Sequence, residues 1–477
     1  MTNSFSNNPQ FDHHRLSALG SIRPGIQEGP RLKQGRLLAP LLLSHSVVLC
    51  VMWLFGGDGT PIESFFVTVF ASVIGIGVLY HIDLRDRLLA GAGIILVTAF
   101  VARIAVGISH FLLVIDPDYF LHPTEFNYLW DYEWLHESMR YLSIHWREES
   151  FLAGLPENFR TENKNAYLIA YMALLYHFTG TYPINMAVWN TLHTLYSAVI
   201  VSDLAVMCGA TRKQAVLALG LVAFEPFGFI STIMWRDSFG QTAVVLGLYL
   251  VMIYRNNIWS LVIVLPIAAF LGYCHRTPYL IAMLLTSAFC YFSNRYKSSA
   301  FVLLKISAGI VLAYVVLSGP FNSIFSAAFG RYLGRNYTTF SLVDLPIRFI
   351  RGVMGPWPWY QVFDVAHPEY MVPDFFQHVF NVAIYCSIAM YLWDAGKRSV
   401  ISPPLFLGVL LFLAGIQASA IHSPYVSVGT VLLVPTVCQV RGVPLQQLII
   451  GVLVIFLLGN AAYWMLGLTN SGIGGFG

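Results

Sequence analysis

Residues 88–114 have the sequence LLAGAGIILVTAFVARIAVGISHFLLV, in which Arg103 is the only Asp, Glu, Lys or Arg residue. About 20 mainly apolar residues are enough for a helix to cross the hydrocarbon core of a bilayer. Similar runs recur along the chain, so the sequence predicts an all-α, polytopic bundle of about 13 transmembrane helices. The predicted spans are 37–55, 64–80, 88–114, 184–207, 214–234, 239–254, 258–274, 277–292, 300–318, 375–393, 403–420, 425–440 and 446–468.

The composition favours a membrane protein over a soluble one. Of the 477 residues, 57% are hydrophobic and 11% are charged, whereas a soluble domain carries about 25% charged residues. The net charge of +3 does not indicate a nucleic-acid partner. The six cysteines form no CxxC pair, so we expect small core residues rather than a disulfide or zinc framework. We predict no cofactor and no metal.

The polar segments divide the chain into regions. Residues 1–36 are predicted to be a cytoplasmic tail, 37–468 a single membrane domain, and 469–477 a short C-terminal tail. Two long polar gaps, 115–165 and 319–374, interrupt the membrane domain. We expect both gaps to be extracytoplasmic loops that cover a site, because long loops held by a scaffold often carry function.

A short apolar segment, 166–178, decides the topology. If it crossed the membrane, the basic turns before and after it would lie on opposite sides, against the positive-inside rule. We therefore expect a re-entrant or interfacial helix on the outer face. The basic clusters that then face the cytoplasm are Arg31/Lys33/Arg36, Arg85/Arg87, Arg212/Lys213, Arg255, Arg295/Lys297, Lys397/Arg398 and Arg441.

Charged turns on the predicted outer face are the first candidates for function. Arg236-Asp237 joins two predicted spans, and His275-Arg276 occupies the corresponding turn two spans later. Ionisable groups at the ends of apolar helices are costly unless they are paired or used.

Loop 319–374 contains four arginines and no lysine, Arg331, Arg335, Arg348 and Arg351. Spacings of four and three place each pair on one face of a helix. A guanidinium binds phosphate through two parallel hydrogen bonds, whereas an ammonium acts as a point charge. We expect these arginines to bind phosphate; contact with the phosphates of lipid headgroups is the alternative.

Loop 115–165 is acidic, and Asp131 and Glu133 lie in it between Trp130 and Trp134, directly before a predicted amphipathic helix over 134–146. Aromatic rings stack on the apolar face of a sugar, and a carboxylate accepts hydroxyl protons. The predicted sugar-binding residues are Asp131, Trp130, Trp134, Trp357 and Trp359. A solvated acidic loop is the alternative.

Two polar residues lie within predicted spans. Glu225 precedes Pro226 and is expected to cap a broken helix. Arg103 is expected either to pair with Glu225 or to extend towards the interface.

Two stretches carry a resemblance to a known family. Residues 165–238 (NAYLIAYMALLYHFTG…STIMWRDS) resemble the core of the GT-C membrane glycosyltransferases. Leu345–Trp359 (LPIRFIRGVMGPWPW) resembles the region before a Pro-aromatic-Pro-Trp motif in Wzy-type bacterial exopolysaccharide and O-antigen polymerases. In many GT-C enzymes the acidic loop follows the first span, whereas here it follows the third.

The resemblance implies a reaction and a location. A glycan on undecaprenyl diphosphate is transferred to another lipid-linked repeat unit, with arginines on the outer face of the bacterial inner membrane holding the diphosphate. The arginines that this implies are Arg236, Arg276, Arg331, Arg335, Arg348 and Arg351. The acceptor hydroxyl of such a transfer needs a base, and four candidates stay open: Asp237, His275, Glu133 and His422. Expected partners are this lipid-linked oligosaccharide, membrane lipid, and chain-length regulator and export proteins. Two alternatives stay open: a GT-C transferase using a polyprenyl-monophosphate sugar, with metal at Asp131/Glu133 or Asp116/Asp118, and a non-enzymatic transporter.

Overall fold

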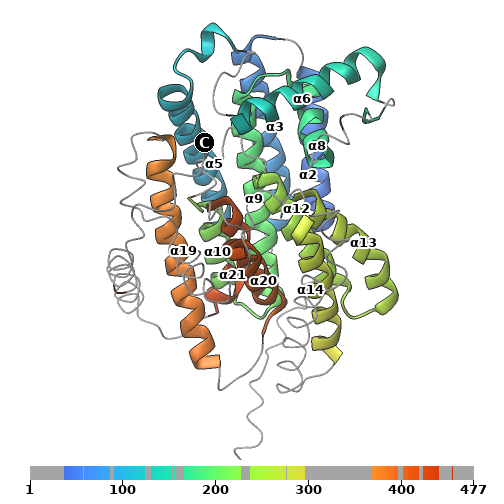
Figure 1. Cartoon of the computed structure of the whole chain (residues 1–477), viewed down its shortest axis with the longest axis vertical. Coiled ribbons are helices and arrows are strands. Elements are labelled where there is room, and N and C mark those ends of the chain that lie inside the picture. The colour runs from blue at the N-terminus through green and yellow to red at the C-terminus, as the bar shows by residue number, and fades with distance from the viewer. Residues whose placement is uncertain are drawn as a thin grey trace, which may run out of the picture.

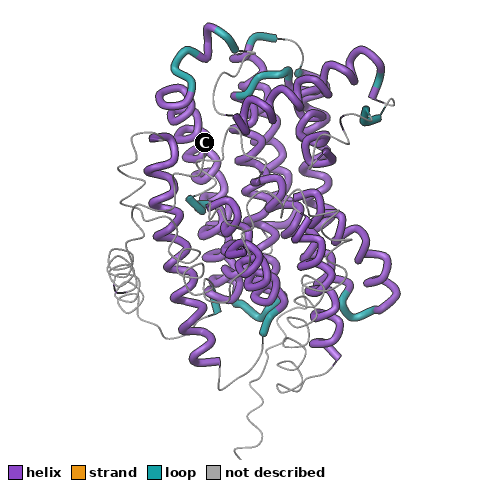
Figure 2. The backbone as a smooth tube through the Cα atoms, in the orientation of Figure 1, coloured by secondary structure: helices purple, strands orange, loops and turns teal. Residues whose placement is uncertain are grey.

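The computed structural model describes residues 37–56, 59–85, 91–123, 130–151, 154–156, 159, 166–226, 237–275, 277–295, 368–395, 401–417, 423–439 and 454. Within these ranges every regular element is a helix and no strand occurs (Figure 2). The predicted all-α class is therefore confirmed.

The helices form an elongated bundle (Figure 1). Their bounds are α2 Leu38–Phe55, α3 Pro61–Leu79, α5 Gly91–His110, α6 Trp130–Glu149, α8 Ala166–Thr179, α9 Ile184–Met207, α10 Arg212–Ala223, α12 Asp237–Tyr254, α13 Ile258–His275, α14 Thr277–Arg295, α19 Pro368–Ala395, α20 Pro403–Gln417 and α21 Ser423–Val437. Wider π-helical turns extend α3 over Tyr80–Leu84 and α5 over Phe111–Ile115.

Five of the described helices are long and apolar enough to cross a bilayer, which makes the chain a membrane protein by length and composition. They are Leu38–Phe55, Pro61–Leu84, Gly91–Leu113, Asp237–Tyr254 and Ile258–His275. The predicted number of about 13 spans is not confirmed. The predicted spans 300–318 and 446–468 lie outside the described residues, apart from Val454.

Helix α9 is the centre of the bundle. Every residue from 184 to 205 is buried, and α3, α5, α10, α12 and α21 pack around it. Outer helices instead expose large apolar side chains, such as Trp53 on α2 and Ile94 on α5, each 71% exposed. Because protein rather than lipid surrounds α9, this helix can carry polar residues such as Asn185 and His193.

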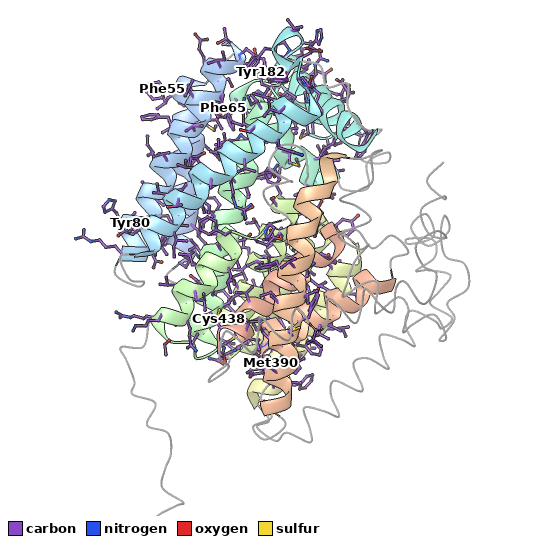
Figure 3. The ribbon with its side chains drawn as sticks, turned by 90° about the vertical axis from the view of Figure 1, so that its left-hand side faces the viewer. Phe55, Phe65, Tyr80, Tyr182, Met390 and Cys438 are labelled. Carbon is purple, nitrogen blue, oxygen red and sulfur yellow. The ribbon has the colours of Figure 1, made fainter. Side chains whose placement is uncertain are left out.

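The short helix α8 connects the outer elements. Its 14 residues give a length of about 21 Å, less than the ~30 Å hydrocarbon core. Its last residue, Thr179, accepts a hydrogen bond from Ser64 of α3, and the Tyr182 hydroxyl donates to Gly59 O at 2.7 Å. Figure 3 places Phe55 and Tyr182 at one end of the bundle and Cys438 and Met390 at the other. That 166–178 does not cross stays a prediction.

Helix α10 ends at Ala223, and the predicted span 214–234 is not one continuous helix, since residues 224–226 are not helical. Arg103 is fully buried and donates from Nε to Ala223 O at 2.6 Å and from Nη2 to Glu225 O at 2.9 Å. The guanidinium thus satisfies carbonyls at a helix C-terminus. The alternative that Arg103 extends towards the interface is wrong.

The six cysteines are all free thiols. Four of them, Cys274, Cys290, Cys386 and Cys438, are buried core residues, as predicted. Cys50 departs from that prediction, because it is exposed on the outer side of α2.

Candidate functional site

Two of the four predicted bases meet at the ends of neighbouring helices. Asp237 is the first residue of α12 and His275 is the last residue of α13. The two side chains are 1% and 0% exposed, and His275 Nε2 lies 3.8 Å from Asp237 Oδ1. This is an ion pair when the imidazole is protonated, and both of its side chains are buried.

A glycine makes the position of His275 possible. A Cβ atom added to Gly240, one turn along α12 from Asp237, would lie 2.0 Å from His275 Nδ1. The imidazole therefore lies directly against the α12 backbone. On its other side the edge of the Tyr279 ring from α14 contacts it, with ring centres 4.8 Å apart. Any larger residue at 240 must displace the histidine.

The helix termini match the charges of this pair. The N-terminus of α12 carries the positive end of a helix dipole beside the Asp237 carboxylate, and the C-terminus of α13 carries the negative end beside His275. An imidazole held beside a buried carboxylate is an arrangement for moving a proton. The pair is thus chemically competent as an acid–base centre.

Helix α8 lies between this pair and the outer helix α6. Tyr171 packs against Phe239 of α12 with ring centres 5.8 Å apart, and Tyr167 packs against Phe270 of α13 at 5.4 Å. On its far side α8 packs against α6, which lies across the end of the bundle (Figure 1). The predicted outer loop is therefore joined to the Asp237 end of α12 through one short helix.

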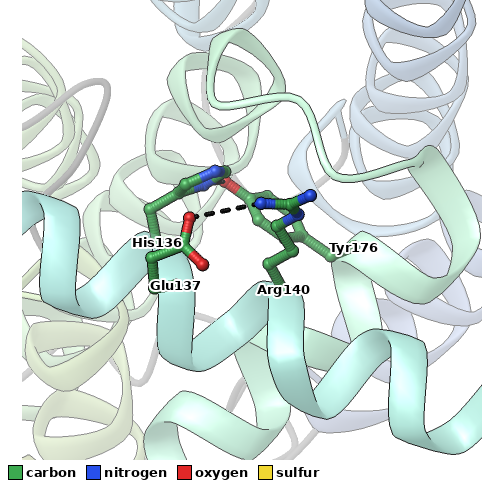
Figure 4. A network of polar contacts seen from close by, with 4 residues as sticks. All are labelled: His136, Glu137, Arg140 and Tyr176. Carbon is green, nitrogen blue, oxygen red and sulfur yellow. Dashed lines mark hydrogen bonds and ion pairs between the residues drawn. The ribbon is translucent and has the colours of Figure 1, made fainter. Parts of the chain in front are cut away.

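The predicted amphipathic helix exists as α6, and its buried residues, including His136, Met139 and Trp146, lie on one side. His136 Nδ1 and Tyr176 OH are 3.0 Å apart beside an exposed Glu137–Arg140 pair (Figure 4). Arg147 donates to the carbonyls at the end of α8.

The predicted sugar-binding segment belongs to this helix and does not precede it. Trp130, Asp131 and Glu133 form the first turn of α6, so the prediction that they come before the helix is wrong. Their side chains lie outside the described residues. Trp134 is 41% exposed, as a ring that stacks on a sugar requires.

Nine predicted site residues lie outside the described residues: Arg236, Arg276, Arg331, Arg335, Arg348, Arg351, Trp357, Trp359 and His422. In the sequence, Arg236 directly precedes Asp237 and Arg276 directly follows His275. The two arginines therefore adjoin the observed pair along the chain.

A second polar cluster was missed by the sequence analysis. Tyr171 OH lies 2.8 Å from His193 Nε2 and 3.1 Å from His45 Nε2. The available signal was a histidine inside an apolar segment, which is uncommon in membrane helices. That signal occurs in LLLSHSVVL and in NTLHTLYS.

The described residues contain no group of three or more His, Cys, Asp and Glu side chains placed to hold a metal ion. Asp116, one of the metal ligands expected under the alternative of a polyprenyl-monophosphate transferase, follows α5. Burial raises the pKa of its carboxyl, and the nearby His122 acts in the opposite direction.

Comparison of the chain with protein-family models, curated proteins and solved structures gave no match. The resemblance to Wzy-type polymerases therefore stays a prediction from the residues.

Proposed function

We propose that this chain is a membrane glycosyltransferase that polymerises undecaprenyl-diphosphate-linked oligosaccharide repeat units at the outer face of the bacterial inner membrane. The observation that carries the proposal is the buried Asp237–His275 pair. Arg236 and Arg276 stand next to it in the sequence. A base and phosphate-binding groups are the two elements that this reaction requires.

The geometry assigns different roles to the two residues of the pair. His275 Nε2 faces Asp237, and Nδ1 lies against Gly240, so both ring nitrogens are directed at α12. The imidazole thus orients the carboxylate, and Asp237 accepts the proton of the acceptor hydroxyl. The hydroxyl oxygen then forms a bond to the anomeric carbon. The bond from that carbon to the diphosphate breaks, and its electron pair leaves with the diphosphate.

The leaving diphosphate gains negative charge, which guanidinium groups stabilise. Loss of one preorganised donor to a developing charge typically costs about 3–4 kcal/mol, or about 100- to 1,000-fold in rate. Because Asp237 is 1% exposed, binding of the acceptor requires a local opening at this carboxylate.

The direct test is polymerisation by purified protein supplied only with undecaprenyl-diphosphate oligosaccharides extracted from the membranes of the source organism. We expect a ladder of products without nucleotide sugar and with chelator present. Asp237→Asn should abolish the ladder. Asp203→Asn is the matched control: Asp203 is also buried but accepts a hydrogen bond from Tyr249 at 2.5 Å, between α9 and α12.

Other outcomes would favour other functions. A single shifted band with a polyprenyl-monophosphate sugar would indicate the one-step transferase, and lipid movement without bond formation would indicate a transporter. A ladder that persists in Asp237→Asn would contradict the assigned base.

Lysine substitution distinguishes arginines that bind the diphosphate through two hydrogen bonds from arginines that supply only a positive charge. Arg236→Lys and Arg276→Lys keep the charge and lose the two-pronged hydrogen bond. We expect each to reduce polymer formation about 100-fold. Arg212→Lys, at the start of α10, should be silent. If lysine is tolerated at both 236 and 276, the proposal that these arginines bind the diphosphate through two hydrogen bonds fails.

A further inference from the structure

Three helices bring two histidines to one tyrosine in the middle of the bundle. His45 is in α2, Tyr171 in α8 and His193 in α9. The Tyr171 hydroxyl contacts His193 Nε2 at 2.8 Å and His45 Nε2 at 3.1 Å. His45 is near the centre of a candidate span, where ionisable side chains are rare and often belong to proton pathways.

The contacts fix the position of each proton. His193 Nδ1 lies 2.8 Å from Trp189 O, and because a carbonyl only accepts, this nitrogen carries the hydrogen. In neutral His193 the Nε2 atom is then an acceptor, so the Tyr171 hydroxyl donates to it. The Tyr171 oxygen in turn accepts from His45 Nε2–H. His45 Nδ1 is left as a buried lone pair that makes no hydrogen bond within the described part of the chain.

We propose that His45, Tyr171 and His193 form an intramembrane proton relay. A proton binds to His45 Nδ1, the Nε2 proton of His45 passes to the Tyr171 oxygen, and the Tyr171 proton passes to His193 Nε2. His45 and Tyr171 end neutral and His193 ends as an imidazolium, so the relay moves one proton and one charge from α2 to α9.

The end state keeps its hydrogen bonds. Charged His193 donates from Nδ1 to Trp189 O and from Nε2 to Tyr171, and the reversed Tyr171 hydroxyl donates to His45 Nε2. Two arrangements of the same side chains are therefore available without moving a helix. This inference goes beyond the proposed glycosyl transfer and does not depend on it.

No charged side chain contacts the relay within the described residues. Tyr196, whose ring lies near both histidines, is the other titratable group in contact, and its hydroxyl is bonded to Ser44. From α12 the neighbour is Phe239, with its ring centre 4.3 Å from that of His193. Within the described residues, the titratable groups that are hydrogen-bonded to one another in this cluster are thus the three relay residues.

The test is nitrogen NMR of full-length protein labelled with ¹⁵N-histidine in lipid nanodiscs. At neutral pH we expect His193 with hydrogen on Nδ1 and His45 with hydrogen on Nε2. The second measurement is the ¹⁵N shifts of both histidine rings as the pH is lowered, because these shifts show which ring becomes the imidazolium. In the wild type the relay should place the charge on His193, while the hydrogen of neutral His45 moves from Nε2 to Nδ1. Tyr171→Phe has no hydroxyl to pass the proton on, so a proton that binds His45 Nδ1 should stay there, and His45 should be the ring that becomes the imidazolium.

Tyr176→Phe is the matched control, because it removes a tyrosine–histidine contact from the same helix at the α6 side, that with His136. It should leave His193 as the ring that becomes the imidazolium. His45→Gln is the second variant: the amide still bonds to Tyr171 but does not take up a further proton, so His193 should stay neutral at a pH at which it is the imidazolium in the wild type. Formation of the His193 imidazolium in both variants as in the wild type, or the opposite tautomers, would overturn the relay.

Discussion

The Asp237–His275 pair and the His45–Tyr171–His193 relay are both buried polar clusters, and both contact α12, the relay through the Phe239 ring. The pair joins a carboxylate and an imidazole at two helix termini, whereas the relay lies within helices and contains no carboxylate. In the pair, helix dipoles stabilise charge where the chain enters and leaves the helices. In the relay, neutral hydrogen bonds satisfy every polar atom except His45 Nδ1.

The difference shows two ways of burying polar chemistry in a membrane bundle. A terminus supplies its own electrostatic field, so a charged group needs few side-chain partners there. In mid-helix one carbonyl of the same helix, Trp189 O, accepts from His193, and the other partners of the relay come from neighbouring helices. The predictions below test this contrast.

The largest effect is expected from breaking the buried pair. His275→Leu leaves Asp237 without its imidazole and should lower the free energy of unfolding by about 3–5 kcal/mol. The control is His145→Leu on α6, because His145 Nδ1 lies 3.7 Å from Glu149, a carboxylate whose side chain is 64% exposed. That change should cost less than about 1 kcal/mol. The measurement is denaturation in mixed micelles. Equal losses of unfolding free energy in the two variants would show that burial does not increase the contribution of the Asp237–His275 pair to stability.

A smaller effect is expected when the pair is displaced without loss of either partner. Gly240→Ala places a methyl group where the structure leaves 2.0 Å to His275 Nδ1, which should destabilise the protein by about 1–3 kcal/mol. Gly77→Ala is the control, since a Cβ at this helical glycine meets nothing within 4 Å. There the helix propensity of alanine should raise stability by up to about 1 kcal/mol. Thermal unfolding of both variants measures this difference. If Gly240→Ala leaves the stability unchanged, the His275 imidazole does not lie against Gly240.

The smallest expected effect is the coupling between the two clusters. The hydrogen bonds of the relay reach Trp189 and none reaches Asp237 or His275. The losses from Tyr171→Phe and His275→Leu should therefore add to within about 0.5 kcal/mol in the double variant. The measurement is a double-mutant cycle of unfolding free energies. A coupling well above that value would show that pair and relay are one network.

The sequence predicted the features that follow from local patterns. The span predicted over 184–207 is helix Ile184–Met207, and the span predicted over 239–254 begins two residues earlier at Asp237. Hydropathy and adjacent charges are local, so they located these helices and the charged residues at their ends, whereas the contact between Asp237 and His275 was not predicted. The break after Ala223 followed from the position of Pro226.

The relay could not be predicted, because its contacts join positions 126 and 22 residues apart. A histidine in an apolar run shows only that a partner is needed, and the partner depends on how α8 packs. The first turn of α6 was missed for another reason. Trp130–Glu133 is polar and aromatic, and nothing in that pattern separates a helix start from a loop.

Arg103 has a consequence for how this protein is made. Its carbonyl partners on α10 lie 120 residues further along the chain. At a synthesis rate of about 5–20 residues per second, α10 leaves the ribosome about 6–24 s after α5. During that interval α5 lies in the bilayer before the α10 carbonyls that bind Arg103 have been synthesised. Insertion of an arginine at the centre of a membrane helix costs about 2.5–3.5 kcal/mol. Insertion of α5 is therefore a provisional step, completed only when a later helix arrives.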